Sequence, residues 1–410
     1  MHGSFAVNYI EGTKAQWLAL QRANALRLEC RIVQYNERLG DRVKSWDIII
    51  VGGGIIGLSL AIELRKTGRS VLLVERGEPG KEASYAAGGM LANCGDEFSE
   101  ALKPLADASA MMYPEFIHEL RDESGLRIDF REDGTILFPA SDRIRQRPDS
   151  HADKLLPSRL RELEPALAPF GSPAFYLRER CVDPRDLVAA CVKAARHRGI
   201  DFSSGDEVKG ITTSGGRASG VTTNRTVFAS DCVVNCAGAW AGLLAPLSFP
   251  TRPVKGQMLA MAMTHKDTLR HVVRAPEVYL IPRSDGRVVI GATVEEAGFN
   301  KQTVPATILR LHEAALKLAP ELRNGKILEA WAGLRPGTPD DLPILGRTFL
   351  PGCFIASGHY RDGILLAPIT AKLMVQVIEG SKTDFDLGAF SAQRFTTNGA
   401  SDKRSFTESA

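Results

Sequence analysis

A continuous hydrophobic run opens the best-defined part of the chain: residues 48–51 are three isoleucines and a valine, directly after Asp47. Such an uninterrupted β-branched run is typical of a parallel strand that is buried on both faces. A glycine-rich turn follows, and residues 58–66 mix apolar and polar positions as a helix does. Gly68 is placed to end that helix, and a second apolar run covers residues 70–75. These segments predict one βαβ unit of about 30 residues.

Two later segments repeat this order of an apolar run followed by a turn of small residues. Residues 232–236 precede the turn Ala237–Trp240, and residues 353–357 precede Gly358. A helix is then predicted over residues 363–379. Because the segments share one pattern although they lie far apart, we expect them to assemble into one parallel sheet.

The intervening segments have a different pattern. Residues 279–283 and 287–291 flank Asp285-Gly286, which predicts a β-hairpin with a tight turn. Residues 135–138 form a further predicted strand. We therefore expect a second, mostly antiparallel domain that is interleaved with the first.

The glycine-rich turn carries the first chemical signal. Gly52, Gly54 and Gly57 form a G-x-G-x-x-G pattern between the strand and the helix. In this context the glycines allow a tight turn, an approach of the backbone to a pyrophosphate, and close packing of helix on strand. Glu75 ends the second strand, where an acid accepts hydrogen bonds from ribose hydroxyls. The turn predicts a dinucleotide site, and the small residues at 80–91 suit a long dinucleotide such as FAD.

Composition narrows the function further. The 410 residues carry 51 basic and 48 acidic side chains, a balance too even to favour nucleic acid as a partner. No apolar run is long enough to span a membrane, and the N-terminus lacks the order of a signal peptide. The seven cysteines have irregular spacing, which does not resemble a disulfide framework. We expect a cytoplasmic protein without a metal site. The sequence does not predict the oligomeric state, and a homo-oligomer is one of the options.

The order of motifs resembles the family of FAD-dependent D-amino-acid oxidases and glycine oxidases, most of all the glycine oxidases of thiamine biosynthesis. The resemblance covers about residues 47–380. It is carried by residues 51–57, Glu75-Arg76, Ala83-Ser84, 88–91, 234–241, 253–258, 279–283, 331–338, 343–346 and 358–368.

The resemblance implies roles for individual residues. Contacts to FAD are implied for Ile55, Ile56, Glu75, Arg76, Ala83, Ser84, Gly88, Gly89, Met90 and the backbone of Val208. A loop made of His359, Tyr360, Arg361, Asp362, Gly363, Ile364 and Leu365 is implied to approach the flavin ring. Arg335 and Arg361 would bind the substrate carboxylate and Tyr279 would flank it. A guanidinium holds a carboxylate bidentately, although a structural ion pair is the alternative for Arg335. His359 could tune the flavin electrostatically or cap a turn.

The resemblance also implies a fold: a discontinuous Rossmann-like FAD-binding domain, α/β in class, with an interleaved and mostly antiparallel substrate domain. The expected division assigns residues 46–100, 165–245 and 325–385 to the FAD-binding domain, 101–164 and 246–324 to the substrate domain, and 396–410 to a disordered tail. Residues 1–45 form an extension for which three interpretations remain: a short packed helix, a flexible segment, or a stretch that is not translated.

The implied reaction is FAD-dependent oxidation of glycine, a small D-amino acid or a secondary amine to an imine, with release of H₂O₂. Alternatives are a D-amino-acid dehydrogenase that reduces quinones, a sarcosine-type oxidase, and, from another class, a non-catalytic module with an FAD fold. No cysteine lies in residues 358–368, so we expect FAD to be bound non-covalently. Two departures from the family pattern limit how far the family's residue roles apply to this chain. Lys255 stands where arginine is frequent, and Glu277 stands near the entrance of the implied site.

Overall fold

The structure is a computed structural model that describes residues 45–94, 99–139, 152–169 and 171–395. The chain divides into two compact units, Met1–Ser45 and Trp46–Ala410, and every element named below belongs to the second. The expected extension, apart from Ser45, and the expected tail lie outside the described residues. Within the described ranges, no helix combines the length and the apolar character that a membrane crossing requires.

A six-stranded sheet confirms the predicted parallel sheet. Its strands follow the order β19-β20-β13-β1-β2-β9, and all neighbours are parallel except β19 and β20. The predicted strands are β1 (Ile48–Val51), β2 (Val71–Glu75), β13 (Val233–Asn235) and β20 (Cys353–Ser357). Sequence analysis missed β9 (Asp201–Ser204) and β19 (Ile344–Arg347) at the two edges.

Both faces of this sheet are covered, which explains the uninterrupted apolar run at its centre. Ile48 and Ile50 belong to a core that also contains α2 (Ile55–Lys66) and α8 (Gly363–Glu379). Ile49 and Val51 face the other way, into a core shared with an antiparallel sheet. That sheet consists of β10 (Val208–Ser214), β11 (Arg217–Thr223) and β12 (Val227–Ala229). Gly68 lies just past the end of α2 at φ +84°, as its helix-ending role requires.

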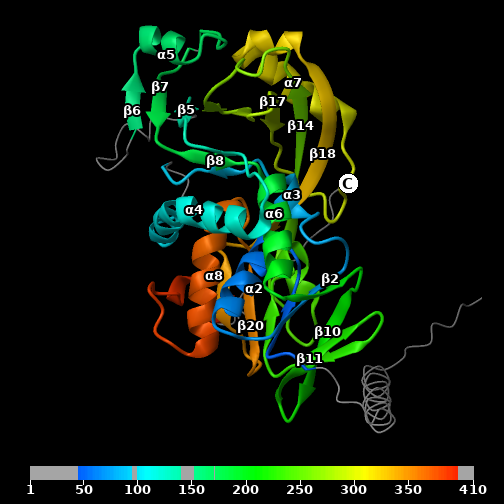
Figure 1. Cartoon of the computed structure of the whole chain (residues 1–410). Coiled ribbons are helices and arrows are strands. Elements are labelled where there is room, and N and C mark those ends of the chain that lie inside the picture. The colour runs from blue at the N-terminus through cyan, green and yellow to red at the C-terminus, as the bar shows by residue number, and fades with distance from the viewer. Residues whose placement is uncertain (1–44, 95–98, 140–151, 170, 396–410) are drawn as a thin grey trace, which may run out of the picture. The chain divides into compact units, whose positions relative to one another are not determined.

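An eight-stranded sheet forms the antiparallel part of the fold, in the order β18-β14-β17-β16-β15-β5-β7-β6. All pairs are antiparallel except β15 with β5. Its strands are β5 (Thr135–Leu137), β6 (Ala152–Leu155), β7 (Ala174–Leu177), β14 (Arg252–Ala262), β15 (Val272–Arg274), β16 (Tyr279–Pro282), β17 (Arg287–Gly291) and β18 (Lys326–Gly337). The predicted hairpin is confirmed, since β16 pairs with β17 and Tyr279 lies opposite Gly291. Figure 1 shows this sheet and α7 (Pro305–Leu318) on the side of the molecule away from α2 and α8.

In the part of the chain that the structure describes, the remaining elements are a small sheet, four helices and four 3₁₀ helices. The strands β3 (Met90–Leu91), β4 (Phe130–Arg131) and β8 (Arg180–Val182) form a sheet in the order β3-β8-β4. The connecting helices are α3 (Ala83–Ala86), α4 (Lys103–Ser124), α5 (Pro157–Leu163) and α6 (Pro184–His197). The 3₁₀ helices are η2 (Gly238–Leu243), η3 (Pro320–Asn324), η4 (Gly388–Phe390) and η5 (Ala392–Phe395).

Three segments join a different layer from the one that the expected division gave them. The helix α4, expected in the substrate domain, shares the core of α2 and α8. The strands β18 and β7, expected in the FAD-binding domain, belong to the eight-stranded sheet. An amphipathic pattern shows that one face of an element is buried but not which sheet it covers, so these assignments could not be made from local sequence. The exact domain boundaries remain a proposal.

Candidate functional site

One cavity of about 820 Å³ brings together nearly all residues that the sequence proposed for the site. From the proposed set, its lining includes Gly52, Gly54, Ile55, Ile56, Glu75, Arg76, Ala83, Ser84, Gly88, Gly89, Met90, Val208, Tyr279, Arg335, His359, Tyr360, Arg361, Asp362, Gly363 and Ile364. Gly57 and Leu365 are outside the lining. A volume of this size lies within the range of pockets for small molecules and cofactors.

Two glycines of the glycine-rich turn, Gly52 and Gly57, have no space for a side chain. A Cβ added to Gly52 would lie 2.4 Å from the carbonyl oxygen of Cys236, and Gly52 has φ +107°. A Cβ added to Gly57 would lie 2.1 Å from the carbonyl oxygen of Gly52. Gly57 therefore packs α2 against the turn, while Gly52 and Gly54 leave the backbone open toward the cavity. This division of roles is the one expected of a dinucleotide turn.

Glu75 is held by the backbone at the end of β2. Its Oε2 accepts a hydrogen bond from the Gly53 N–H at 2.7 Å, and its Oε1 accepts one from the Gly77 N–H at 2.9 Å. At the start of α2 the Ile55 N–H donates to Ser84 Oγ at 2.9 Å. A fixed carboxylate beside a glycine turn and a helix N-terminus matches the chemistry of a ribose followed by a pyrophosphate. The residues present thus fit the dinucleotide part of FAD.

An aromatic and basic stack borders the same part of the cavity. The Arg76 guanidinium lies 3.6 Å from the ring centre of Trp240, and Phe299 stacks on Trp240 with ring centres 5.1 Å apart. Glu82 accepts from Arg76 at 2.6 Å and forms an ion pair with Lys301 at 3.0 Å. Sequence analysis proposed Arg76 but missed Trp240, although Trp240 lies in one of the motifs that carried the resemblance.

The loop before α8 forms another part of the lining. His359 is only 3% exposed, and its Nε2 lies 3.1 Å from Thr370 Oγ1. Burial lowers the pKa of His359 to about 3, so the ring is neutral near neutral pH. A neutral ring places no positive charge beside the cavity, which argues against electrostatic tuning of the flavin by this residue. Leu365 is buried in the core, and its carbonyl accepts a hydrogen bond from Ser109 Oγ; its contact with FAD stays a prediction.

Three proposed substrate residues line the cavity together, although they come from three different segments. Arg335, on β18, donates from Nη1 to the Thr293 carbonyl at 3.0 Å. Its guanidinium lies across Gly256 of β14, where an added Cβ would be 2.3 Å from Nη1. Burial raises the pKa of Tyr279, and the nearby charges of Arg335 and Arg361 oppose that rise. An arginine fixed over a glycine, beside a neutral tyrosine, is suited to orienting a small carboxylate.

The two departures from the family pattern have different places. Lys255 does not line the cavity; it is buried on the other face of β14, with Nζ 3.7 Å from Glu295 Oε2. Glu277 does line the cavity and is exposed. Met258 also contributes to the lining, and its sulfur lies 3.7 Å from the Tyr279 hydroxyl. Nothing in the local sequence around Met258 indicates this contact, because the two residues meet only through the sheet.

The fold and the cavity define a class of protein. A glycine turn with an acid at the end of the second strand, opening into a cavity that an antiparallel sheet closes, is the arrangement of a two-domain dinucleotide-dependent enzyme. The comparison with protein families gives the same result: the model of the family described as FAD dependent oxidoreductase matches residues 47–377. The chain belongs to this family, and the prediction of FAD as cofactor is confirmed.

Individual relatives carry related names. The chain is 37% identical over 377 residues to the bifunctional protein ThiO/ThiG of Trichormus variabilis, covering 89% of this chain and 57% of the relative. It is 34% identical to the glycine oxidase of Pseudomonas aeruginosa, covering 83% of this chain and 96% of the relative. The crystal structure of glycine oxidase from Geobacillus kaustophilus matches with a TM-score of 0.80 and 33% identity, over 85% of this chain and 99% of that one. The chain spans a little over half the length of the bifunctional relatives.

Proposed function

We propose that this chain is an amino-acid oxidase of the glycine oxidase type. Its substrate is glycine, a small D-amino acid or a small secondary amine that carries a carboxylate. The observation that carries the proposal is the guanidinium of Arg335, which lies across Gly256 and beside Tyr279 in a cavity of an FAD-dependent enzyme. The names of the relatives, glycine oxidase and ThiO/ThiG, support the same substrate class.

The balanced reaction converts the amine into an imine. The substrate loses two electrons and two protons from Cα and the nitrogen, and O₂ takes them up to form H₂O₂. Bound FAD supplies the electron-accepting chemistry. The chain needs no acid–base residue at Cα for this conversion when the amine is neutral, so orientation is its main contribution.

Arg335 and Arg361 have the charge to hold the carboxylate of the substrate. Arg335 is constrained by Thr293 and by the surface of Gly256. Arg361 is exposed on the loop before α8, with its guanidinium carbon 5.1 Å from the ring centre of Tyr360. The Tyr360 N–H donates to the Pro336 carbonyl at 2.9 Å, so the segments that carry Arg335 and Arg361 lie side by side. A carboxylate bound by both guanidinium groups would be fixed in position and orientation.

Tyr279 has a supporting role in the proposed reaction. Its ring crosses Gly291, where an added Cβ would lie 2.6 Å from both the ring carbon Cζ and the hydroxyl oxygen Oη. Because burial raises the pKa of Tyr279, its hydroxyl stays neutral and can donate a hydrogen bond to the substrate, for example to the substrate carboxylate. We further propose a place in thiamine biosynthesis, which the resemblance and the ThiO part of the relatives' name support.

The test is an assay of O₂ consumption and peroxide release with glycine, sarcosine and D-alanine, in parallel with an assay of dye reduction. We expect peroxide with at least one of the three substrates. Arg335→Met should raise KM for the amino acid while the visible flavin spectrum stays unchanged. Dye reduction without peroxide would instead indicate a dehydrogenase. No turnover in either assay, by a protein that retains FAD, would refute the proposal.

A further inference from the structure

Arg283 is a buried cation immediately behind the wall of the cofactor cavity. It follows β16 in the hairpin and is only 2% exposed. Its Nη2 donates to the carbonyl of Gly88 at 2.7 Å, and its Nη1 donates to the carbonyl of Val182 at 3.1 Å. Gly88 lines the cavity, whereas Arg283 does not. The guanidinium therefore clamps the wall from outside.

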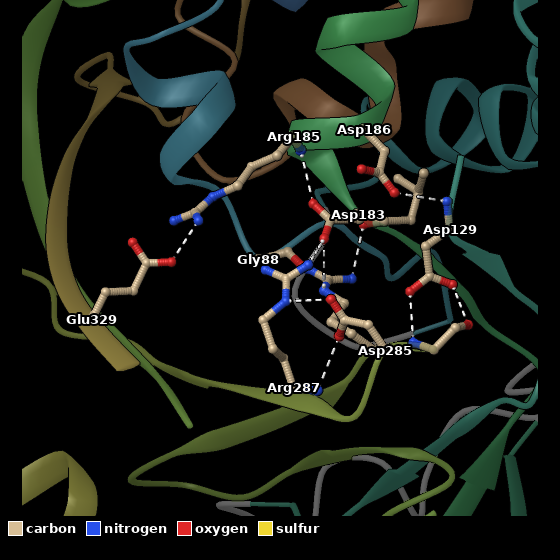
Figure 2. A network of polar contacts seen from close by, with 11 residues as sticks. Gly88, Asp129, Asp183, Arg185, Asp186, Asp285, Arg287 and Glu329 are labelled. Atoms are coloured by element: carbon tan, nitrogen blue, oxygen red, sulfur yellow. Dashed lines mark hydrogen bonds and ion pairs between the residues drawn. The ribbon is translucent and has the colours of Figure 1, made fainter. Parts of the chain in front are cut away.

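The charge of Arg283 is balanced by one buried carboxylate. Asp183 is 2% exposed and lies at the first turn of α6, with Gly88 and Arg287 beside it in Figure 2. Its Oδ2 is 3.7 Å from Arg283 Nε and accepts a hydrogen bond from Arg287 Nη2 at 2.9 Å. Its Oδ1 caps α6 by accepting from the Arg185 N–H at 2.9 Å. Burying charges costs free energy unless each has partners, so this arrangement holds Arg283 in a defined place.

The hairpin that carries Arg283 is fixed at its tip as well. Asp129 accepts hydrogen bonds from the Ser284 N–H at 2.8 Å and from Ser284 Oγ at 2.6 Å. Asp129 in turn donates its N–H to Asp186 Oδ2 at 3.1 Å, which ties the contact to α6. The guanidinium of Arg283 is thus positioned both by the tip of the hairpin and by the start of α6.

The clamp determines the direction of one peptide group in the wall. Across a trans peptide the N–H points opposite to the C=O. Because the Gly88 carbonyl points out of the cavity toward Arg283, the Gly89 N–H points into it. Among the residues that the structure describes, this N–H has no acceptor. Only glycine fits at position 89 in this arrangement, since an added Cβ would lie 1.9 Å from the Val182 carbonyl oxygen.

We propose that Arg283, with Asp183 as its counter-ion, is a positioning residue of the cofactor site that directs the Gly89 N–H toward bound FAD. Arg283 does not touch the cofactor cavity itself; it acts through the Gly88–Gly89 peptide. A hydrogen bond from this N–H stabilises the electron-rich reduced flavin more than the oxidised flavin. If the N–H loses its orientation, both the flavin midpoint potential and the affinity for FAD are therefore lowered.

The experiment compares two variants in the holoenzyme. Arg283→Lys keeps the positive charge but can reach only one of the two carbonyls. Arg287→Gln is the matched control, because Arg287 shares Asp183 with Arg283 but bonds neither Gly88 nor Val182. The FAD dissociation constant is measured by flavin fluorescence on dilution, and the midpoint potential by a spectroscopic redox titration. Thermal unfolding of each holoenzyme verifies that it is folded.

We expect about tenfold weaker FAD binding for Arg283→Lys, the effect of one misaligned hydrogen bond, together with a lower midpoint potential. Arg287→Gln should resemble the wild-type enzyme in both. The proposal is overturned if Arg283→Lys alters only the unfolding temperature, if it changes affinity without the potential, or if Arg287→Gln produces equal shifts. Neither measurement uses an amino acid, so both remain informative if the proposed substrate class is wrong.

Discussion

Replacing Gly256 with alanine is a direct test of the proposed substrate anchor. The added methyl group would lie 2.3 Å from Nη1 and 2.5 Å from Nη2 of Arg335. Both atoms belong to the end of a flexible side chain, so the guanidinium can move while the strands stay paired. Gly256 does not have a positive φ angle, so its backbone conformation is also open to alanine. The substitution should therefore displace one functional group without unfolding the protein.

The size of the effect follows from the displacement. Ordinary contacts of a Cβ begin at about 3.4 Å, so the guanidinium must retreat by roughly 1 Å. A misplacement of about 1 Å in a positioning group can cost about 100-fold in rate. We therefore expect kcat/KM for glycine to fall about 100-fold, which corresponds to about 2.7 kcal/mol of transition-state stabilisation.

The assay is steady-state peroxide release with glycine and with ethylamine, which lacks a carboxylate. Turnover of ethylamine should be weak in the wild-type enzyme and nearly unchanged in Gly256→Ala. Gly171→Ala is the control, because a Cβ there meets nothing within 4 Å. The combined variant Gly256→Ala with Arg335→Met should be no worse than Arg335→Met alone, since both remove the same contact. A glycine kcat/KM within threefold of wild type, or additive losses in the combined variant, would refute the anchoring role of Arg335.

Three further predictions concern other parts of the site. Glu277→Gln should change the relative kcat/KM values for glycine, sarcosine and D-alanine, and identical ratios would remove Glu277 from substrate selection. Because burial lowers the pKa of His359 from 6.5 to about 3, protonation below pH 6.5 favours the unfolded chain, so stability is lost as the pH falls toward 3. The free energy of unfolding should fall by at most about 1.4 kcal/mol per pH unit. His359→Gln should reduce this dependence on pH, measured by urea unfolding between pH 7 and pH 5. An unchanged dependence would contradict the prediction. Acid precipitation should leave the yellow colour in the supernatant, whereas a yellow pellet would show covalent FAD.

The cofactor turn could be predicted from sequence because its information is local. Strand, turn, helix and second strand follow one another within residues 47–75, and each has its own pattern of apolar residues or glycines. The parallel sheet was predictable for a related reason, since its distant strands repeat that pattern. The edge strand β9 escaped because Asp201–Ser204 is short and largely polar.

Contacts between distant segments could not be predicted in the same way. The stack of Arg76, Trp240 and Phe299 joins three segments, and no spacing rule connects them. The charge pair of Arg283 and Asp183 is similar, because a sequence shows two charged residues but not that both are buried. The layer of α4 depended on tertiary packing, which overrides local pattern.

One face of β16 explains how the two halves of the site are held in register. Tyr279, Ile281 and Arg283 alternate along the chain, so their side chains share a face. All three meet Gly88: a Cβ on this glycine would lie 2.8 Å from Ile281 Cδ1 and 3.5 Å from the Tyr279 ring, and Arg283 bonds its carbonyl. The residue proposed to flank the substrate thus lies on β16, and the residue proposed to orient the cofactor wall follows directly after this strand. Because that strand pairs with β15 and β17 on its two sides, substrate and cofactor positions are coupled through a single rigid element rather than through a flexible loop.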